Sequence, residues 1–250
     1  MSSSEIQAAA KLLLNEGKAI FFTGAGVSKE SGIPTFRDAM TGLWANYDPE
    51  ELATPQAFKR NPSLVWQWYD ERRARLGQIS PNPGHHAIAD LESLKSKVLV
   101  ITQNVDGLHK LAGSSDVLEL HGNISEFFCF DHRHAAKNIP LGLKEAPKCH
   151  CGSLIRPAVV WFNEALPEDE FARAQKEILQ ASVLFVIGTS ALVHPAAGLP
   201  ILALQNHIDV VEINPDDTPL SRSASLILRG ASGKILPEIV AEFKKMKSDK

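Results

Sequence analysis

The sequence predicts an α/β fold in which a Rossmann-like parallel sheet carries helices on both faces. Short apolar runs rich in Val, Ile and Phe recur at residues 19–23, 98–102, 183–187 and 210–213. Such runs are typical of parallel strands buried on both faces. Helical patterns such as 83–94 and 168–180 lie between them, and this alternation predicts a doubly wound sheet that binds ligands at the carboxyl ends of its strands.

One stretch, from about residue 126 to 156, interrupts this alternation. It lacks apolar periodicity and holds all three cysteines of the chain. An odd number of clustered cysteines favours a metal site over a disulfide framework. We therefore predict a small inserted domain of zinc type, formed by about 41–79 and 126–156, and a large domain formed by about 1–40, 80–125 and 157–250.

Composition excludes several classes of function. The net charge of −3 shows no basic excess of the kind that phosphate neutralisation requires. No apolar run reaches the roughly 20 residues that cross a bilayer, and residues 1–5 do not resemble a signal peptide. We expect a cytoplasmic protein that binds neither nucleic acid nor membrane.

A glycine-rich loop follows the first apolar run and reads Gly24-Ala25-Gly26-Val27-Ser28. Glycines allow a backbone to approach a pyrophosphate closely, but Lys29 stands where the dinucleotide fingerprint has its third glycine. Taken alone, the loop describes an unliganded turn equally well. The chain continues with a stiff turn, an aromatic ring and a guanidinium that can bind phosphate, in Ile33-Pro34-Thr35-Phe36-Arg37.

The string GAGVSKESGIPTFR, residues 24–37, closely resembles the NAD-binding loop of the sirtuins. Further motifs carry the same resemblance in the same order: QNVDGLH at 103–109, ELHGN at 119–123 and VVWFNE at 159–164. The resemblance spans about 17–237. It implies that NAD is the cofactor and that acylated lysine side chains of proteins are the partners. The acyl group would pass to ADP-ribose, releasing nicotinamide and free lysine.

Polar residues follow the predicted strands, where a nucleotide would lie. By the resemblance, Gln103 contacts the nicotinamide riboside, and Asn104 and Asp106 shape the carboxamide pocket. The adenosine end is implied to contact Gly188, Thr189, Ser190, Asn214, Pro215 and Asp216, with the backbone near Ser232 over the adenine. Each of these segments, taken singly, also fits an ordinary turn.

His121 is the predicted catalytic residue. A lone histidine is more often structural, but imidazole is the side chain best suited to exchange a proton near neutral pH. The segment around it resembles the sirtuin motif that carries the catalytic histidine. We expect His121 to take a proton from a ribose hydroxyl after nicotinamide has left.

Substrate choice is predicted from Tyr69 and Arg72, which lie on one face of a helix at positions i and i+3. A phenol beside a guanidinium can bind a carboxylate, although this spacing alone also fits a helix surface. The pair resembles the mark of sirtuins that remove succinyl and malonyl groups, and Gly42-Leu43-Trp44 fits that branch too. Deacetylation is expected to persist in a pocket of this size.

Residues 159–164 resemble the sirtuin strand that pairs with the substrate peptide, with Val160 and Phe162 as its predicted contacts. An apolar run of this kind would otherwise belong to the core. Asn163 stands where the family has glycine, and asparagine tolerates unusual backbone angles better than most residues.

The predicted metal ligands are Cys129, His132, Cys149 and Cys151, with His134 or His150 as alternatives to His132. Sirtuins carry two pairs of cysteines here, so this chain departs from the pattern. Tetrahedral zinc accepts three thiolates and one imidazole, and a structural site with four ligands leaves no position for substrate. A module that folds without metal is the alternative.

Three other functions fit the same motifs. A plain deacetylase would not need Arg72, and a non-catalytic NAD or ADP-ribose sensor would not need His121. An enzyme that transfers ADP-ribose to protein would label the protein instead of forming O-acyl-ADP-ribose.

Overall fold

A six-stranded parallel sheet forms the centre of the protein. The computed structural model describes residues 2–34 and 52–249. The strand order is β3-β2-β1-β7-β8-β9, and every pairing is parallel. The strands are β1 (Lys18–Thr23), β2 (Val98–Thr102), β3 (Val117–Glu119), β7 (Ala181–Ile187), β8 (Asp209–Ile213) and β9 (Leu226–Leu228).

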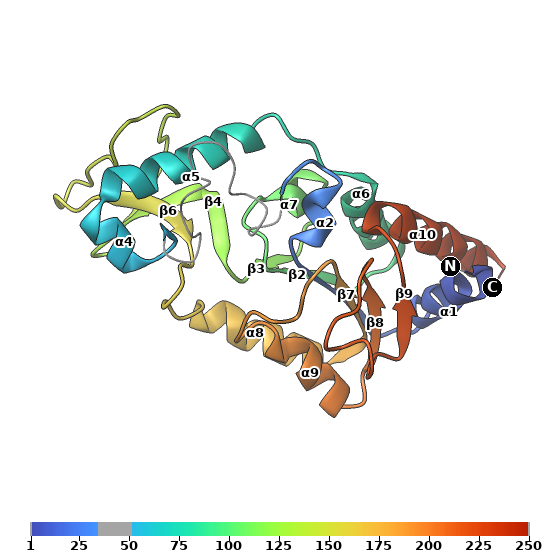
Figure 1. Cartoon of the computed structure of the whole chain (residues 1–250). Coiled ribbons are helices and arrows are strands. Elements are labelled where there is room, and N and C mark those ends of the chain that lie inside the picture. Colours follow the sequence, from blue (N-terminus) through green and yellow to red (C-terminus); the bar gives the residue numbers. More distant parts are fainter. Residues whose placement is uncertain (1, 35–51, 250) are drawn as a thin grey trace.

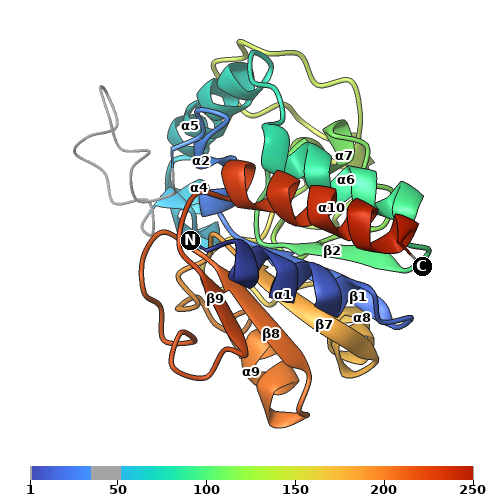
Figure 2. The same cartoon turned by 90° about the vertical axis from the view of Figure 1, so that its right-hand side faces the viewer.

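Helices cover both faces of this sheet, so the predicted fold class is confirmed (Figure 2). Successive residues of β1 point to opposite faces: Phe21 joins one apolar core and Phe22 the other. The first core packs under α1 (Ser3–Leu13), α6 (Pro83–Leu94) and α10 (Ser232–Ser248). The second packs under α8 (Glu168–Leu179) and α9 (Gly198–Gln205).

The strand order reverses between β1 and β7. From β1 the chain proceeds outward to β2 and β3 on one side, and later from β7 to β8 and β9 on the other. In open α/β sheets the crevice at such a reversal, beyond the carboxyl ends of the strands, is where ligands bind. Two single-turn helices begin there, α2 (Gly26–Lys29) after β1 and α7 (Leu108–Leu111) after β2.

A second sheet, with antiparallel order β5-β4-β6, lies to one side of the first (Figure 1). Its strands are β4 (Gly122–Cys129), β5 (Ala135–Ala136) and β6 (Ile155–Val159), and helices α4 (Pro55–Arg60) and α5 (Pro62–Leu76) lie beside it. These elements share a third core with many aromatic side chains, among them Phe58, Trp66, Trp68, Tyr69, Phe127 and Trp161. We call α4, α5 and this sheet, with the segments joining its strands, the small lobe.

No helix within residues 2–34 and 52–249 is long and apolar enough to span a membrane.

Candidate active site and metal centre

The carboxyl ends of the central strands bring most of the predicted cofactor residues together. Gln103 follows β2, and its side-chain amide donates to Thr189 Oγ1 after β7, at 3.0 Å. Asn214 follows β8, and its amide donates to the carbonyl of Thr189 at 2.9 Å. Segments more than 80 residues apart in sequence thus form one continuous polar edge at the strand reversal.

The glycine-rich loop packs directly against the segment after β7. A Cβ on Gly26 would lie 2.7 Å from Gly188 Cα, and one on Gly24 would lie 2.8 Å from Thr189 Cβ. The N–H of Gly26 donates to the Gly188 carbonyl at 2.8 Å, and the N–H of Ser28 donates to Ala25. These glycines are therefore required for contact between two loops, and not only to let a phosphate approach.

Ser28 is the centre of a buried polar network. Its hydroxyl donates to Asp106 Oδ2 at 2.8 Å and accepts from the amide of Asn104 at 3.1 Å. His85 Nε2 lies 3.3 Å from the same oxygen, while His85 Nδ1 accepts from the N–H of Asn82. His85 therefore carries its proton on Nε2 and donates to Ser28. Burial raises the pKa of Asp106, and hydrogen bonds from Leu108 and Ser28 oppose that effect.

A second buried histidine, His109, lies behind this network, with its ring 4.8 Å from that of His85. The Thr23 hydroxyl donates to Thr102 Oγ1, so it accepts from His109 Nε2 at 2.9 Å. Burial lowers the pKa of His85 to about 4 and that of His109 to about 3, so both rings are neutral at physiological pH. Sequence reasoning did not assign either ring a role; only the QNVDGLH motif, which ends in His109, gave a signal.

His121 lies where β3 leads into β4, at the junction of the large sheet and the small lobe. Its Nδ1 is 2.8 Å from the carbonyl of Gln103, which can only accept, so Nδ1 carries the proton and Nε2 is left with a lone pair. Burial lowers the pKa of His121, and the bond to Gln103 opposes this. A Cβ on the next residue, Gly122, would lie 1.9 Å from the Ala158 carbonyl, so only glycine fits this turn.

The remaining cofactor predictions fall at the edge of this site or outside the described residues. The N–H of Ile33 donates to the Ser28 carbonyl, and Pro34 follows it. Ser190, Pro215 and Asp216 are exposed. Ser232 begins α10, with its hydroxyl 3.4 Å from Glu30. Thr35, Phe36 and Arg37 lie outside the described residues, as do Gly42, Leu43 and Trp44.

Tyr69 and Arg72 lie in α5, with Tyr69 buried and Arg72 partly buried. The Arg72 guanidinium lies 4.9 Å from the centre of the Trp68 ring. The Tyr69 hydroxyl accepts the indole N–H of Trp161 at 2.9 Å. Burial raises the pKa of Tyr69 to about 12, although the nearby Arg72 charge and the Trp161 bond oppose it. Tyr69 is therefore a neutral phenol.

The predicted peptide-binding segment, 159–164, follows the last strand of the small lobe. The N–H of Val160 donates to the carbonyl of His121, and that of Phe162 to the carbonyl of Ala53, both at 2.8 Å. A peptide pairing with these two residues would have to donate its own N–H groups to their carbonyls. Asn163 has φ of 67°, a left-handed conformation that asparagine adopts more readily than most residues.

An ion pair between a buried arginine and a partly buried glutamate, which the sequence did not signal, braces the same segment. Arg156 is 1% exposed, and its guanidinium donates to both oxygens of Glu164, at 2.6 and 3.0 Å. Glu164 also accepts the N–H of Trp161 at 2.8 Å. The guanidinium lies 3.2 Å from the centre of the Trp161 ring. Trp161 is thus held by its backbone, its ring face and its indole N–H.

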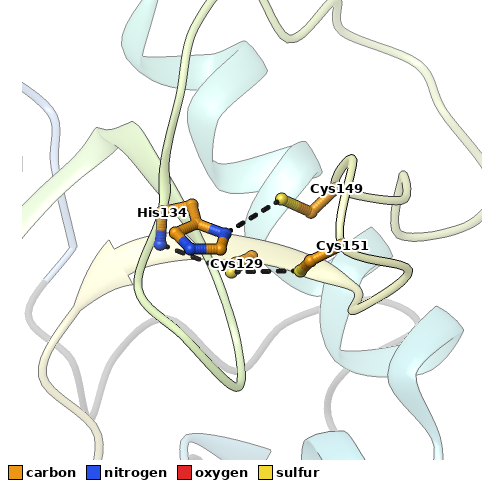
Figure 3. A group of neighbouring side chains, drawn as sticks. All are labelled: Cys129, His134, Cys149 and Cys151. Atoms are coloured by element: carbon orange, nitrogen blue, oxygen red, sulfur yellow. Dashed lines mark hydrogen bonds between the residues drawn. The ribbon is translucent and has the colours of Figure 1, made fainter.

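Four side chains of the small lobe converge on one point: Cys129, His134, Cys149 and Cys151 (Figure 3). One ligand atom from each lies within 4.8 Å of the others. Cys129 ends β4, His134 precedes β5, and the other two cysteines flank a turn before β6. Burial raises the pKa of the Cys129 thiol, but hydrogen bonds from His132, His134 and the other two cysteines outweigh it, so its pKa is lowered.

Comparison with known proteins agrees with this arrangement. The profile of the Sir2 family matches residues 24–195. The chain belongs to the Sir2 family. It is 53% identical, over 84% of its length and 87% of the relative's, to NAD-dependent protein deacylase 1 of Caldanaerobacter subterraneus. It is 45% identical to a Pyrococcus abyssi NAD-dependent protein deacylase, over 95% and 97% of the two chains.

Solved Sir2 structures share the fold. A Sir2 homolog in complex with NAD superposes with a TM-score of 0.89 at 44% identity, covering 98% of this chain and 95% of that one. A Sir2 protein bound to a myristoylated histone peptide superposes with a TM-score of 0.78 at 33% identity, covering 100% of both chains. The predicted family is confirmed.

The predicted metal set of this Sir2 chain needs one correction, because His134 takes the place of His132. The N–H of Arg133 donates to the Cys129 carbonyl, and Arg133 has φ of 54°, so the chain reverses sharply there. The reversal brings the N–H of His134 to 3.3 Å from Cys129 Sγ. His132 is left exposed on the outside, its ring stacked on that of His134 at 5.4 Å.

The spacing of these four groups fits zinc. Cys151 Sγ lies 3.9 Å from Cys129 Sγ, and Cys149 Sγ lies 3.7 Å from His134 Nδ1. A tetrahedron with Zn–S bonds of about 2.3 Å has edges of about 3.8 Å. A disulfide would need sulfurs about 2 Å apart. Three thiolates and one imidazole would therefore hold a four-coordinate zinc in the small lobe.

Proposed function

We propose that this protein is an NAD-dependent protein lysine deacylase that prefers acidic acyl groups, succinyl and malonyl, and also removes acetyl. One observation carries the proposal: His121, with Nε2 as its free base, lies between the polar strand ends and segment 159–164. A nucleotide on the first and a peptide on the second would meet beside this imidazole. The named activity of the relatives, NAD-dependent protein deacylation, supports the same reaction.

The residues at the strand ends fit NAD. Gln103, Asn104 and Asp106 offer amide and carboxyl groups in the segment after β2, whose Gln103 carbonyl binds His121. Such groups suit a carboxamide and ribose hydroxyls. When bound, NAD supplies a ribose carbon from which nicotinamide leaves and a ribose hydroxyl that receives the acyl group. Acyl-lysine, NAD and one water would give nicotinamide, O-acyl-ADP-ribose and free lysine; the water supplies the oxygen and hydrogens needed when the acyl–lysine bond is cleaved.

His121 performs the proton transfer in this proposal. Its Nδ1–H stays bonded to the Gln103 carbonyl, which fixes the ring and stabilises the positive charge that forms when Nε2 accepts a proton from the ribose hydroxyl. Burial keeps the imidazole neutral at lower pH than usual, so the base form is available at neutral pH.

Tyr69 and Arg72 support the acidic acyl preference. The phenol is neutral and buried, and the guanidinium stays charged at all physiological pH values. A carboxylate at the end of a succinyl chain could accept from both, whereas acetyl offers no such group. Zinc in the small lobe is assigned a structural role, because all four of its ligands come from the protein.

The test compares acetyl-, succinyl- and malonyl-lysine peptides with NAD, using the wild type and Tyr69→Phe/Arg72→Met. We expect kcat/KM for succinyl to exceed that for acetyl, and the double change to remove that difference. A wild type that strongly prefers acetyl, together with a silent double change, would contradict the acidic preference.

A second arm tests the role of His121. His121→Asn should lower kcat by roughly 10²–10⁴-fold, as expected for loss of a general base. His207→Asn is the control, since His207 is an exposed histidine just before β8, at the end of the sheet opposite the carboxyl ends of the strands. If His121→Asn retained full turnover, a sensor or another base would have to replace the proposed mechanism.

A further inference from the structure

We propose that Trp161 is a specificity-determining positioning residue, which orients the Tyr69 hydroxyl toward the acyl group. The inference rests on the proposed preference for acidic acyl groups and adds a residue to it. Trp161 lies in the peptide-binding segment and Tyr69 in α5, 92 positions apart in sequence, and one buried hydrogen bond of 2.9 Å joins them.

The direction of this bond is fixed by chemistry. An indole N–H can only donate, so the Tyr69 oxygen is the acceptor. The phenol has one hydrogen, which cannot point at Trp161. With its pKa raised to about 12 by burial, Tyr69 keeps that hydrogen under all working conditions. The hydroxyl is therefore oriented as a donor to a group other than Trp161.

A donor of this kind discriminates between acyl groups. A carboxylate accepts a hydrogen bond about twice as strong as a neutral acceptor does. An indole N–H that donates to the phenol oxygen also polarises the O–H and strengthens its donation. Without Trp161, the phenol could turn and accept from another donor, and its hydrogen would no longer be aimed at the substrate.

Trp161 itself is held too tightly to move aside. It is 2% exposed, its backbone N–H donates to Glu164, and the Arg156 guanidinium covers its ring. The ring of Phe58 lies 5.3 Å away. The indole N–H is therefore held in one position. Its bond to Tyr69 fixes segment 159–164 relative to α5.

The test removes this N–H and keeps an aromatic ring, by Trp161→Phe. The matched control is Trp66→Phe, because Trp66 is buried in the same core and its indole N–H donates to the Leu143 carbonyl at 3.0 Å. We expect Trp161→Phe to lower the ratio of kcat/KM for succinyl- over acetyl-lysine peptide roughly fivefold, the value of one net hydrogen bond. Trp66→Phe should leave this ratio unchanged.

A spectroscopic readout tests the bond without any substrate. In ¹⁵N-labelled protein, the indole signal that disappears in Trp161→Phe should shift and exchange faster in Tyr69→Phe, while the Trp66 signal stays. If Tyr69→Phe leaves the Trp161 signal unchanged, the bond does not exist and the proposal is overturned.

The kinetic outcomes separate this proposal from the proposed function. If Tyr69→Phe lowers the succinyl-to-acetyl ratio and Trp161→Phe does not, the acidic preference stands and the role of Trp161 is overturned. If the wild type does not favour succinyl and Tyr69→Phe leaves the succinyl-to-acetyl ratio unchanged, the acidic preference fails. The specificity role of Trp161 then fails too, even if the indole signal shows that its bond to Tyr69 exists. In the Tyr69→Phe background, Trp161→Phe should have no further effect on the ratio.

Discussion

The two sheets of this protein are held together by different interactions. The parallel sheet is aliphatic and aromatic, with strands such as β2 buried at every residue and an apolar core on each face. In the small lobe, β5 has only two residues, and the described stretch between His134 and Cys149 contains little regular structure. There, the Arg156 guanidinium lies against aromatic rings, and four candidate metal ligands converge on one point.

This difference predicts where stability is concentrated. Apolar burial in the parallel sheet is shared by many side chains, so each contributes a modest part. The small lobe has an apolar core too, but it also contains a buried arginine and four candidate metal ligands. Removing one partner from such a set leaves an uncompensated charge or an incomplete metal shell. We expect the two regions to respond differently to the same kinds of change.

The largest difference should follow loss of the metal. Cys149→Ser, or a strong zinc chelator, should release about one zinc per chain and unfold the small lobe, since metal binding in such sites contributes roughly 10 kcal/mol. Amide hydrogen exchange should then become fast in β4 and β6 and stay slow in β2 and β7. His207→Asn is the control, because His207 is exposed and lies between α9 and β8, outside the small lobe.

Two outcomes would contradict this account of the metal site. If the purified protein holds no zinc and the chelator leaves exchange in β4 and β6 unchanged, the lobe folds without metal. Release of zinc from His132→Asn but not from His134→Asn would reverse the correction to the ligand set.

The ion pair of Arg156 and Glu164 should give the next largest effect. Arg156→Met leaves the partly exposed Glu164 carboxylate without its partner and should lower the free energy of unfolding of the lobe by about 3 kcal/mol, the upper end for a hydrogen bond to a charged group. Arg173→Met is the control, since its pair with Asp116 is solvent-exposed and should contribute less than about 1 kcal/mol. Denaturant melts followed by tryptophan fluorescence would compare the two. An equal loss of unfolding free energy in both variants would show that the burial of Arg156 does not make its ion pair more stabilising than an exposed one.

The sequence predicted the parallel sheet well because its signal is local. Runs such as Val98 to Thr102 carry their own periodicity, and polar residues at their ends mark the ligand edge. The ends of β2, β7 and β8 are linked through Thr189, and the loop after β1 bonds to the neighbouring Gly188. Topology alone brings such ends to one edge.

The small lobe was harder to predict because its contacts are not local. Nothing in the sequence pairs Tyr69 with Trp161 or places Arg156 inside a core, where an arginine is rarely buried. His132 fitted the common spacing of a metal pair, but the backbone reversal at Arg133 decides which imidazole turns inward. A turn with a positive φ at arginine has no clear sequence signal.

A smaller effect should come from the two histidines behind the strand ends. His85 and His109 have folded pKa values near 4 and 3, below the unfolded value of about 6.5. Below pH 6.5 the unfolded chain binds protons that the folded protein does not, so stability falls as pH falls. At pH 5 the loss is roughly 2 kcal/mol for each ring.

Substitution of one ring should remove part of this dependence. The groups that affect these rings are His86 and the two rings themselves, with Asp106 joined to His85 through Ser28. In His85→Gln, the decline in unfolding free energy between pH 7 and pH 5 should be smaller than in the wild type by roughly 2 kcal/mol. His207→Gln changes an exposed histidine between α9 and β8, on the other face of the sheet, and should leave the decline unchanged. The same decline in both variants would rule out a buried neutral His85.

The smallest expected effect compares the same conservative change in both regions. Ile101→Val in β2 and Ile155→Val in β6 each remove one buried methylene and should cost about 0.5–1.5 kcal/mol with metal present. After chelation the cost of Ile101→Val should persist, because the parallel sheet keeps its core. The cost of Ile155→Val should vanish, because a lobe that is already unfolded has no core to lose. Hydrogen exchange of β2 and β6, measured in both variants with and without metal, gives the cost of each change. A cost of Ile155→Val that persists after chelation would show that the lobe's apolar core survives without its metal.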